Sequence, residues 1–544
     1  MHRTSTLITN LLCGLCVCAP VAAAAQEPYS PLVPRGTVRL GLRGDYYSFS
    51  SRYGLWGSGT AGLEQLSDAF SGPADAGVFP QLEPFATALR NAAGEPFAVS
   101  LGTLDAVMEK ATTRVPVSLD VGVFDWLTVG AEVPFVRSDT EFSLTFAADS
   151  AHADAGFSPG MADPGLVTGF LSGLQNSITM YDAFRASTCS ADPNSPECRD
   201  ATALVADARI FRNSLATMYG TMFAPVGWSP AGVALQARLT ALAEAFQAAG
   251  VTGTPGSVPL AAGPLTFEEL LGLVMDPAHG IAASYPLENW QSLWALGDIE
   301  ARVDARLLES GDPEGPSHVF AGAGALVRLP TGQQDDPANF IDIGSGDAQM
   351  DIEARAWMNG RWRRVGLWAD LRYGVQMKGT TERRAFDPNV TFAPLASQVQ
   401  LDWNPGDYQF LELSPWYEVA PTMRLLAGYR YFRKGMDAFA IRAVPPPDTE
   451  PPAGMATTAF ATKDAGLTAV PDPDALVPES GASSSRLMLG LVYNRDVAVD
   501  NGEAGRPLEI RVVYRHVVGG SGGDVPNARS FEAGFRFFVG LWGG

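Results

Sequence analysis

The sequence predicts an all-β protein: a transmembrane antiparallel β-barrel of about twelve strands, with a large α-helical insertion between the third and fourth strands. Three observations predict this fold. Apolar and polar residues alternate along about a dozen segments, the connections between these segments alternate in length, and a short apolar stretch precedes them all. Because successive side chains of a strand point to opposite faces, each segment has one apolar and one polar face. A barrel with lipid outside and a polar lumen inside explains all three features.

The first 25 residues have the features of a secretory signal peptide. Arg3 lies near the start without any acid in the first ten residues, an apolar stretch follows, and four alanines precede Gln26. A membrane-spanning helix would need roughly 20 apolar residues, so this stretch is too short to be an anchor. We therefore expect four parts: a signal peptide at 1–25, a first barrel part at 26–147, an extracellular helical insertion at 148–290 and a second barrel part at 291–544.

The segment at 299–307 shows the strand pattern most clearly. Ile299, Ala301 and Val303 alternate there with charged residues such as Arg302 and Asp304. Bacterial single-chain barrels have an even number of strands, which agrees with twelve. The predicted strands lie at 38–46, 115–123, 127–135, 299–307, 319–329, 348–356, 365–375, 398–416, 423–431, 487–493, 508–514 and 531–539.

The connections predict how the barrel is oriented. Short turns face the periplasm in such barrels and long loops face outward, so both termini and the short connections are expected in the periplasm. Aromatic residues near the strand ends are typical of the two girdles at the lipid–water interfaces. Short connections lie at 124–126, 310–316, 359–361, 417–422 and 494–506, and long ones at 50–112, 148–289, 331–346 and 435–484. One expected girdle contains Trp126, Trp357, Trp362, Trp416, Tyr493 and Phe537, and the other Tyr46, Phe135, Trp294, Tyr373, Tyr429 and Tyr514.

The long interruption between strands has helical periodicity. Ser229-Pro230 is a capping residue followed by a first-turn proline, and an apolar stripe follows from Leu235 to Phe246. Similar stripes begin after Asp163, after residue 203 and after a capping box at 266–269. Four such helices can bury their stripes against one another. Cys189 and Cys198 lie in a connection without histidine, so in an oxidising compartment a disulfide is favoured over a metal site.

The composition argues against several functions. A net charge of −21 argues against nucleic acid as a partner, because phosphate binding needs basic patches. His152, His279, His318 and His516 match no zinc or triad spacing, and on the predicted map His318 and His516 lie at opposite ends of the barrel. We therefore expect no catalytic residues, no metal and no cofactor, and the protein is predicted not to be an enzyme.

The polar faces of the strands supply the candidate functional residues. Arg302, Glu353, Arg372, Arg430 and Arg511 are expected to line the lumen. Two interpretations remain open for these charges. They can form salt bridges that hold the shape of the barrel, or they can set the selectivity of a polar conduit.

Three segments resemble one family of outer-membrane barrels, the family named for a transporter of the meta-pathway of phenol degradation. That family is similar in layout to the long-chain fatty-acid outer-membrane transporters. The resemblance covers the barrel from about residue 114 onward and implies porin-like passive uptake of small hydrophobic or aromatic solutes. The segments are 122–136, 296–307, and 329–332 followed by 344–347.

We therefore expect a bacterial outer-membrane protein whose partners are membrane lipid, a small hydrophobic or aromatic solute and, during biogenesis, the barrel assembly machinery. The helical insertion is larger than the loop expected from the resemblance, so the alternative is a surface binding or adhesion protein anchored by its barrel. A membrane hydrolase is the third and weakest candidate, because the histidines are scattered. Only residues 26–36 precede the first strand, so any gate is expected in the loops or lumen side chains.

Overall fold

In the computed structural model, strands with alternating faces form a closed barrel of twelve long antiparallel strands. The structure describes residues 30–54, 62–149, 152–275, 280–282, 289–312, 315–339, 341–387, 392–442, 471–495, 508–522 and 525–540. The predicted signal peptide at 1–25 lies outside the described residues. The strands are β1 (Thr37–Phe49), β5 (Thr103–Phe124), β6 (Leu127–Ala147), β11 (Glu300–Gly311), β12 (Ser317–Arg328), β13 (Asp351–Trp362), β14 (Val365–Gln376), β17 (Tyr408–Ala420), β18 (Met423–Lys434), β20 (Ala482–Arg495), β21 (Leu508–Ser521) and β23 (Arg529–Gly540).

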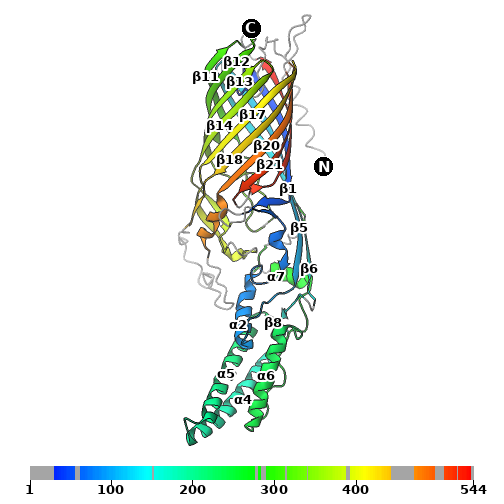
Figure 1. Cartoon of the computed structure of the whole chain (residues 1–544), viewed down its shortest axis with the longest axis vertical. Helices are drawn as coiled ribbons and strands as arrows, with labels where there is room; N and C mark the ends of the chain where they lie inside the picture. Colours follow the sequence, from blue (N-terminus) through cyan, green and yellow to red (C-terminus); the bar gives the residue numbers. More distant parts are fainter. Residues whose placement is uncertain are drawn as a thin grey trace, which may run out of the picture.

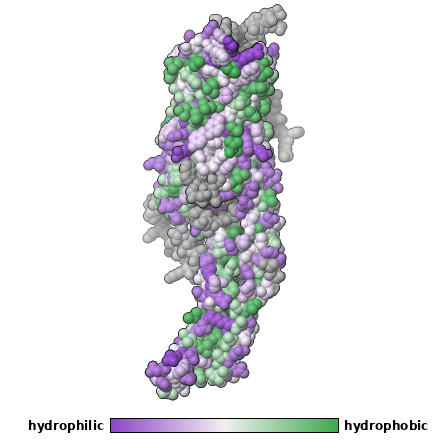
Figure 2. Space-filling view, in the orientation of Figure 1, coloured by the Kyte–Doolittle hydropathy of each residue, from purple (hydrophilic) through white to green (hydrophobic). Residues whose placement is uncertain are grey.

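The barrel closes because β1 pairs with β23 on one side and with β5 on the other. Along each strand the side chains alternate between the lumen and the outer surface, as the sequence predicts. In β11, Ala301 and Val303 are exposed on the outside, whereas Asp304 is buried inside. Hydrophobic residues gather on the visible side of the barrel (Figure 2). The predicted twelve-stranded fold and its inside–outside pattern are confirmed.

Several strand boundaries differ from the prediction. The short connection expected at 359–361 lies inside β13, and the turn between β13 and β14 is at 363–364. The expected strand at 398–416 is two strands, because Pro405-Gly406 forms a turn between β16 (Gln398–Asn404) and β17. Only β17 belongs to the barrel, while β16 forms a separate sheet. Residues 103–112, expected in a loop, belong to β5. This strand and β6 continue as a two-stranded ladder past the other strands, toward the helices (Figure 1).

The girdle prediction is wrong for two residues. Trp357 and Trp416 are buried, and both point into the lumen. Both follow the strand alternation, since their neighbours Met358 and Tyr417 are exposed on the outer face. Strand parity, and not position near a strand end, decides where an aromatic side chain points.

The helices form a separate hydrophobic core at the end of the molecule opposite to the C-terminus (Figure 1). No described helix has the length and apolar character needed to cross a membrane. The four predicted helical stretches are present as α4–α7, whereas α2 and the four-residue helices α3 and α8 were not predicted. The helices are α2 (Glu83–Ala93), α3 (Pro159–Ala162), α4 (Pro164–Ala191), α5 (Pro196–Tyr219), α6 (Pro230–Ala248), α7 (Phe267–Val274) and α8 (Val477–Ser480).

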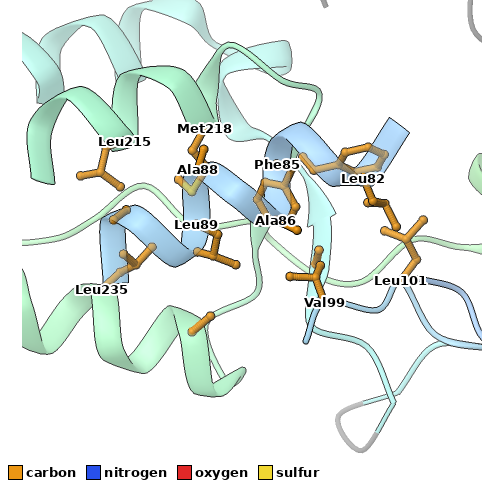
Figure 3. Close-up of a cluster of buried hydrophobic side chains, with 14 of the residues drawn as sticks. Leu82, Phe85, Ala86, Ala88, Leu89, Val99, Leu101, Leu215, Met218 and Leu235 are labelled. Carbon is orange, nitrogen blue, oxygen red and sulfur yellow. The ribbon is translucent and has the colours of Figure 1, made fainter. Parts of the chain in front are cut away.

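Helix α2 connects the loop after β1 to the helical core. Its side chains Phe85 and Leu89 lie between α5 and α6 (Figure 3), and Leu104 of β5 and Phe142 of β6 belong to the same core. The disulfide predicted between Cys189 and Cys198 is present and joins the ends of α4 and α5. We call this unit, α2 with α4–α7, the helical cap.

The remaining strands are short and lie at the same end of the barrel as the long connections. Two of the sheets they form contain three strands, β2–β3–β22 and β15–β16–β19, and a third pairs β7 with β8. The short strands are β2 (Ser51–Tyr53), β3 (Leu63–Gln65), β4 (Gly72–Pro73), β7 (Ala155–Phe157), β8 (Phe223–Pro225), β9 (Trp290–Gln291), β10 (Ala295–Leu296), β15 (Gly379–Arg384), β19 (Ala438–Ile441) and β22 (Val525–Pro526).

Candidate functional site in the barrel lumen

The lumen contains a cavity of about 490 Å³ whose wall is dominated by charged side chains. Inward-facing positions of all twelve barrel strands contribute to it, which follows from the parity of each strand. Its arginines are Arg39, Arg43, Arg114, Arg302, Arg328, Arg355, Arg372, Arg430, Arg486, Arg511, Arg515 and Arg536, and its carboxylates are Asp45, Glu132, Glu300, Asp304, Glu353, Asp370, Glu412, Glu509 and Glu532.

The structure places all five predicted lumen residues in the wall of this one cavity: Arg302, Glu353, Arg372, Arg430 and Arg511. Each of them also takes part in an ion pair. The two interpretations of these charges therefore describe the same residues. A side chain that is part of the salt-bridge network also faces the cavity.

Buried carboxylates hold the network together, each between two arginines. Asp120 accepts from Arg302 at 2.5 Å and from Arg39 at 2.9 Å, and Asp370 lies 2.7 Å from Arg372 and 2.9 Å from Arg355. Both carboxylates are almost fully buried. A buried carboxylate that lost both of its arginines would be an uncompensated charge, which costs about 3–5 kcal/mol, so the network specifies the arrangement of the wall.

A second set of ion pairs lies on β17 and β18, next to Asp370 of β14, and on β21 and β23, next to β1. Glu412 accepts from Arg430, with 2.6 Å between the closest atoms. Glu532 pairs with both Arg511, at 3.1 Å, and Arg515. Both carboxylates are nearly inaccessible to solvent, so their charge is committed to these arginines.

Aromatic side chains interrupt the charged wall, and Phe410 is the one that contacts two of its arginines. Phe410 points inward from β17, and its ring centre lies 4.7 Å from the guanidinium of Arg372 and 4.9 Å from that of Arg430. These distances are typical of cation–π contacts. The cavity therefore presents a flat apolar surface next to charged groups.

Residues 30–32, shortly before β1, lie inside the end of the lumen that bears the short turns. Leu32 packs against inward-facing aromatic side chains of β12, β13 and β14, namely Phe320, Trp357 and Trp368. Arg39 donates to the carbonyls of Ser30 and Pro31, at 2.8 and 3.1 Å. The expectation that any gate lies in the loops or lumen side chains stays a prediction, and the packing of Leu32 adds a further segment at this end of the lumen. The apolar residues directly before the first strand were the available signal.

The three histidines that the structure describes after residue 30 lie apart from one another. His152 pairs with Asp149 at 2.7 Å, whereas His318 pairs with Glu309 at 3.0 Å near a short turn. His516 is on β21, and His279 lies outside the described residues. Among the described residues, no group of three or more histidine, cysteine, aspartate or glutamate side chains is placed to hold a metal ion.

A half-buried carboxylate outside the membrane-spanning strands has a perturbed pKa. Asp347 lies in the connection between β12 and β13, and burial raises its pKa to about 6, with Asp298 and Asp351 adding to the increase. Asp298 accepts from the backbone of Gly332 at 2.8 Å and of Asp347 at 3.2 Å. Protonation of Asp347 therefore relieves repulsion within this loop.

Comparisons with known proteins give the following matches. No protein-family model and no curated protein matches the chain. It is similar to the structure of an outer-membrane channel from Pseudomonas putida F1, with a TM-score of 0.36, 9% identity and coverage of 95% of this chain and 99% of that one. It is also similar to a FadL homologue of Pseudomonas aeruginosa (TM-score 0.25, 8% identity, coverage 93% and 90%) and to the Ralstonia pickettii toluene transporter TbuX (0.26, 9%, 94% and 90%).

Proposed function

We propose that this chain is a bacterial outer-membrane barrel through which small hydrophobic or aromatic solutes diffuse down their gradient. The observation that carries the proposal is the combination of an apolar outer belt with a cavity inside the closed barrel. An exposed belt of leucine, valine and aromatic side chains around a closed barrel is stable in lipid, and a barrel interior of this kind serves as a path. Passive diffusion needs no cofactor and no covalent chemistry.

The orientation follows from the lengths of the connections. Short turns in the periplasm place both termini there and the helical cap outside the cell. Biogenesis then involves export by the predicted signal peptide at 1–25 and insertion by the barrel assembly machinery. The meta-pathway family resemblance supports the solute class, and we assign selectivity to the lumen residues Arg302, Glu353, Arg372, Arg430 and Arg511.

The charged wall restricts which solutes fit this proposal. A purely apolar molecule gains little from guanidinium and carboxylate groups, whereas the ring of Phe410 offers it a stacking surface. Preferred solutes therefore combine an apolar or aromatic body with at least one polar group.

Transport is tested with the purified, folded protein. Single-channel conductance in planar bilayers and flux of benzyl alcohol into protein-containing liposomes should both exceed the values for protein-free membranes. Folding is checked first by heat-modifiable gel mobility. A folded protein that shows neither conductance nor flux contradicts the transport function.

The surface-binding alternative is tested by removing helices α4–α6. A variant that keeps its flux separates transport from the helical cap and removes the alternative. Protease added to intact cells should cleave in the cap and leave the short turn at residues 310–316 intact. Cleavage only after the outer membrane is permeabilised would reverse the proposed orientation.

A further inference from the structure

One arginine of the lumen differs from all the others. Eleven of the twelve arginines in the cavity wall have a carboxylate within 4.0 Å. Within the described part of the chain, Arg486 has no ion pair and no hydrogen bond, and its Nε is buried without a partner. A buried guanidinium without a counter-charge is costly, so this position needs an explanation.

The environment of Arg486 increases that cost. Arg486 on β20 lies directly opposite Arg430 on β18, and its ladder partner on β21 is Val517, two positions from Arg515. Directly opposed residues of antiparallel strands are close neighbours, and diagonal ones remain within reach of long side chains. We call Arg430, Arg486 and Arg515 the arginine cluster.

The carboxylates near the arginine cluster are already committed. Glu412 on β17 pairs with Arg430, and Glu532 on β23 pairs with Arg511 and Arg515. Asp45 on β1 lies 2.8 Å from Arg43 and 3.9 Å from Arg515. The cluster therefore has one positive charge more than the protein neutralises locally, although the whole chain has a net charge of −21.

The arginine cluster belongs to the same cavity as Phe410 and Tyr47. Phe410 contacts Arg430, so an aromatic surface adjoins the positive groups. A planar guanidinium binds a carboxylate with two parallel hydrogen bonds, and a ring attached to that carboxylate can lie along the aromatic surface.

We propose that the arginine cluster is a binding site for the carboxylate of a small aromatic acid, with Arg486 as the residue that binds it. The proposal rests on the proposed transport function and narrows its solute class from aromatic solutes in general to aromatic monocarboxylates. The bound carboxylate supplies the negative charge that no described side chain supplies to Arg486.

Benzoate is the probe, and benzyl alcohol is its uncharged counterpart of nearly the same shape. Binding to the purified full-length protein is measured by isothermal titration calorimetry, and flux is measured in liposomes. Arg486→Gln should weaken benzoate binding about tenfold or more, because a hydrogen-bonded charge pair is lost. Benzyl alcohol carries no charge, so its flux should change less in this variant than the binding of benzoate.

Arg529→Gln is the matched control. Arg529 lies on β23 toward the same rim, but it is exposed and is not part of the cavity wall. Its removal takes away one positive charge of the same kind, and benzoate binding should remain within about twofold of the wild-type value, because an exposed charge is screened. Arg486→Lys keeps the charge but loses the planar geometry, and should bind benzoate with intermediate affinity.

The two proposals fail in different ways. If wild type binds benzoate, Arg486→Gln does not, and neither protein shows flux, the result supports the binding site and contradicts transport. Equal benzoate binding by wild type and Arg486→Gln, with benzyl alcohol flux present, would overturn the site and leave transport intact. Inorganic phosphate serves as a competitor. If phosphate displaces benzoate at a concentration below the Kd of benzoate, the assignment of the site to a carboxylate is wrong.

Discussion

The barrel and the helical cap place their apolar residues on opposite sides. In the cap, Phe211 of α5 and Leu235 of α6 are completely buried, and charged residues such as Arg209 and Asp182 face outward. In the barrel, leucines and valines are exposed around the outside and the charged residues fill the interior. The hydrophobic effect operates in both regions, but water surrounds one and lipid the other.

The comparison also identifies one exception inside the barrel. Around Leu32, the end of the lumen that bears the short turns is filled by apolar side chains, as in the core of a water-soluble domain. Leu32 is buried there against inward-facing side chains of β12–β14. Burial between protein segments, and not membrane depth, decides the composition at this place.

The largest expected effect is in the cap. Phe211→Ala removes a fully buried ring that contacts Arg238, whose guanidinium lies 5.2 Å from the ring centre. It should destabilise the cap by about 3–5 kcal/mol, because a large cavity remains. Protease sensitivity should increase in α4–α6 while the heat-modifiable mobility of the barrel stays unchanged. Loss of barrel folding in this variant would show that cap and barrel are one cooperative unit.

The barrel should respond to the opposite kind of change. Leu367→Arg or Ala301→Arg puts a charge on the lipid-facing side and costs about 2–4 kcal/mol at mid-membrane, so insertion should fail. Arg302→Ala is the control, because this side chain faces the lumen and Asp120 keeps Arg39 as a partner. Gel mobility measures folding of all three. Equal folding of the three variants would refute the inside–outside assignment.

The apolar exception predicts a change in conductance. Leu32→Asp should release the segment before β1 from its aromatic neighbours and increase single-channel conductance severalfold, because the short-turn end of the lumen opens. Arg35→Ala is the matched control, since Arg35 belongs to the same segment but is exposed. Identical conductance in wild type and Leu32→Asp would show that this segment does not limit passage.

The smallest expected effect concerns the loop that contains Asp347. A carboxyl whose pKa is about 6 when folded binds its proton more tightly in the folded loop than in the unfolded chain. Protection of this loop should therefore be greatest below about pH 4 and should decrease as the pH rises to about 6 and above. Hydrogen exchange at residues 331–350, corrected for its intrinsic pH dependence, measures this. Asp347→Asn should remove the pH dependence, whereas Asp342→Asn should keep it.

Strand parity determined most of this fold from the sequence alone. Alternation in segments such as 299–307 identified the twelve barrel strands and put Arg302, Glu353, Arg372, Arg430 and Arg511 on the inner face, where the structure places them. Capping residues and apolar stripes located four helices. These signals are local: each depends on neighbours within one strand or helix, so no knowledge of distant segments is needed.

Only the tertiary structure decided which groups meet across the lumen. Helix α2 joins a core built mainly from residues 70 and more positions away, and Leu32 fills a space made by β12–β14, so neither role has a local pattern. Strand parity treats Arg486 like the other lumen arginines, so the sequence gives no sign that it differs from them. Among the described arginines of the cavity wall, Arg486 is the one without a carboxylate partner. This difference depends on the registers of β18, β20 and β21, and register is set by long-range pairing and packing.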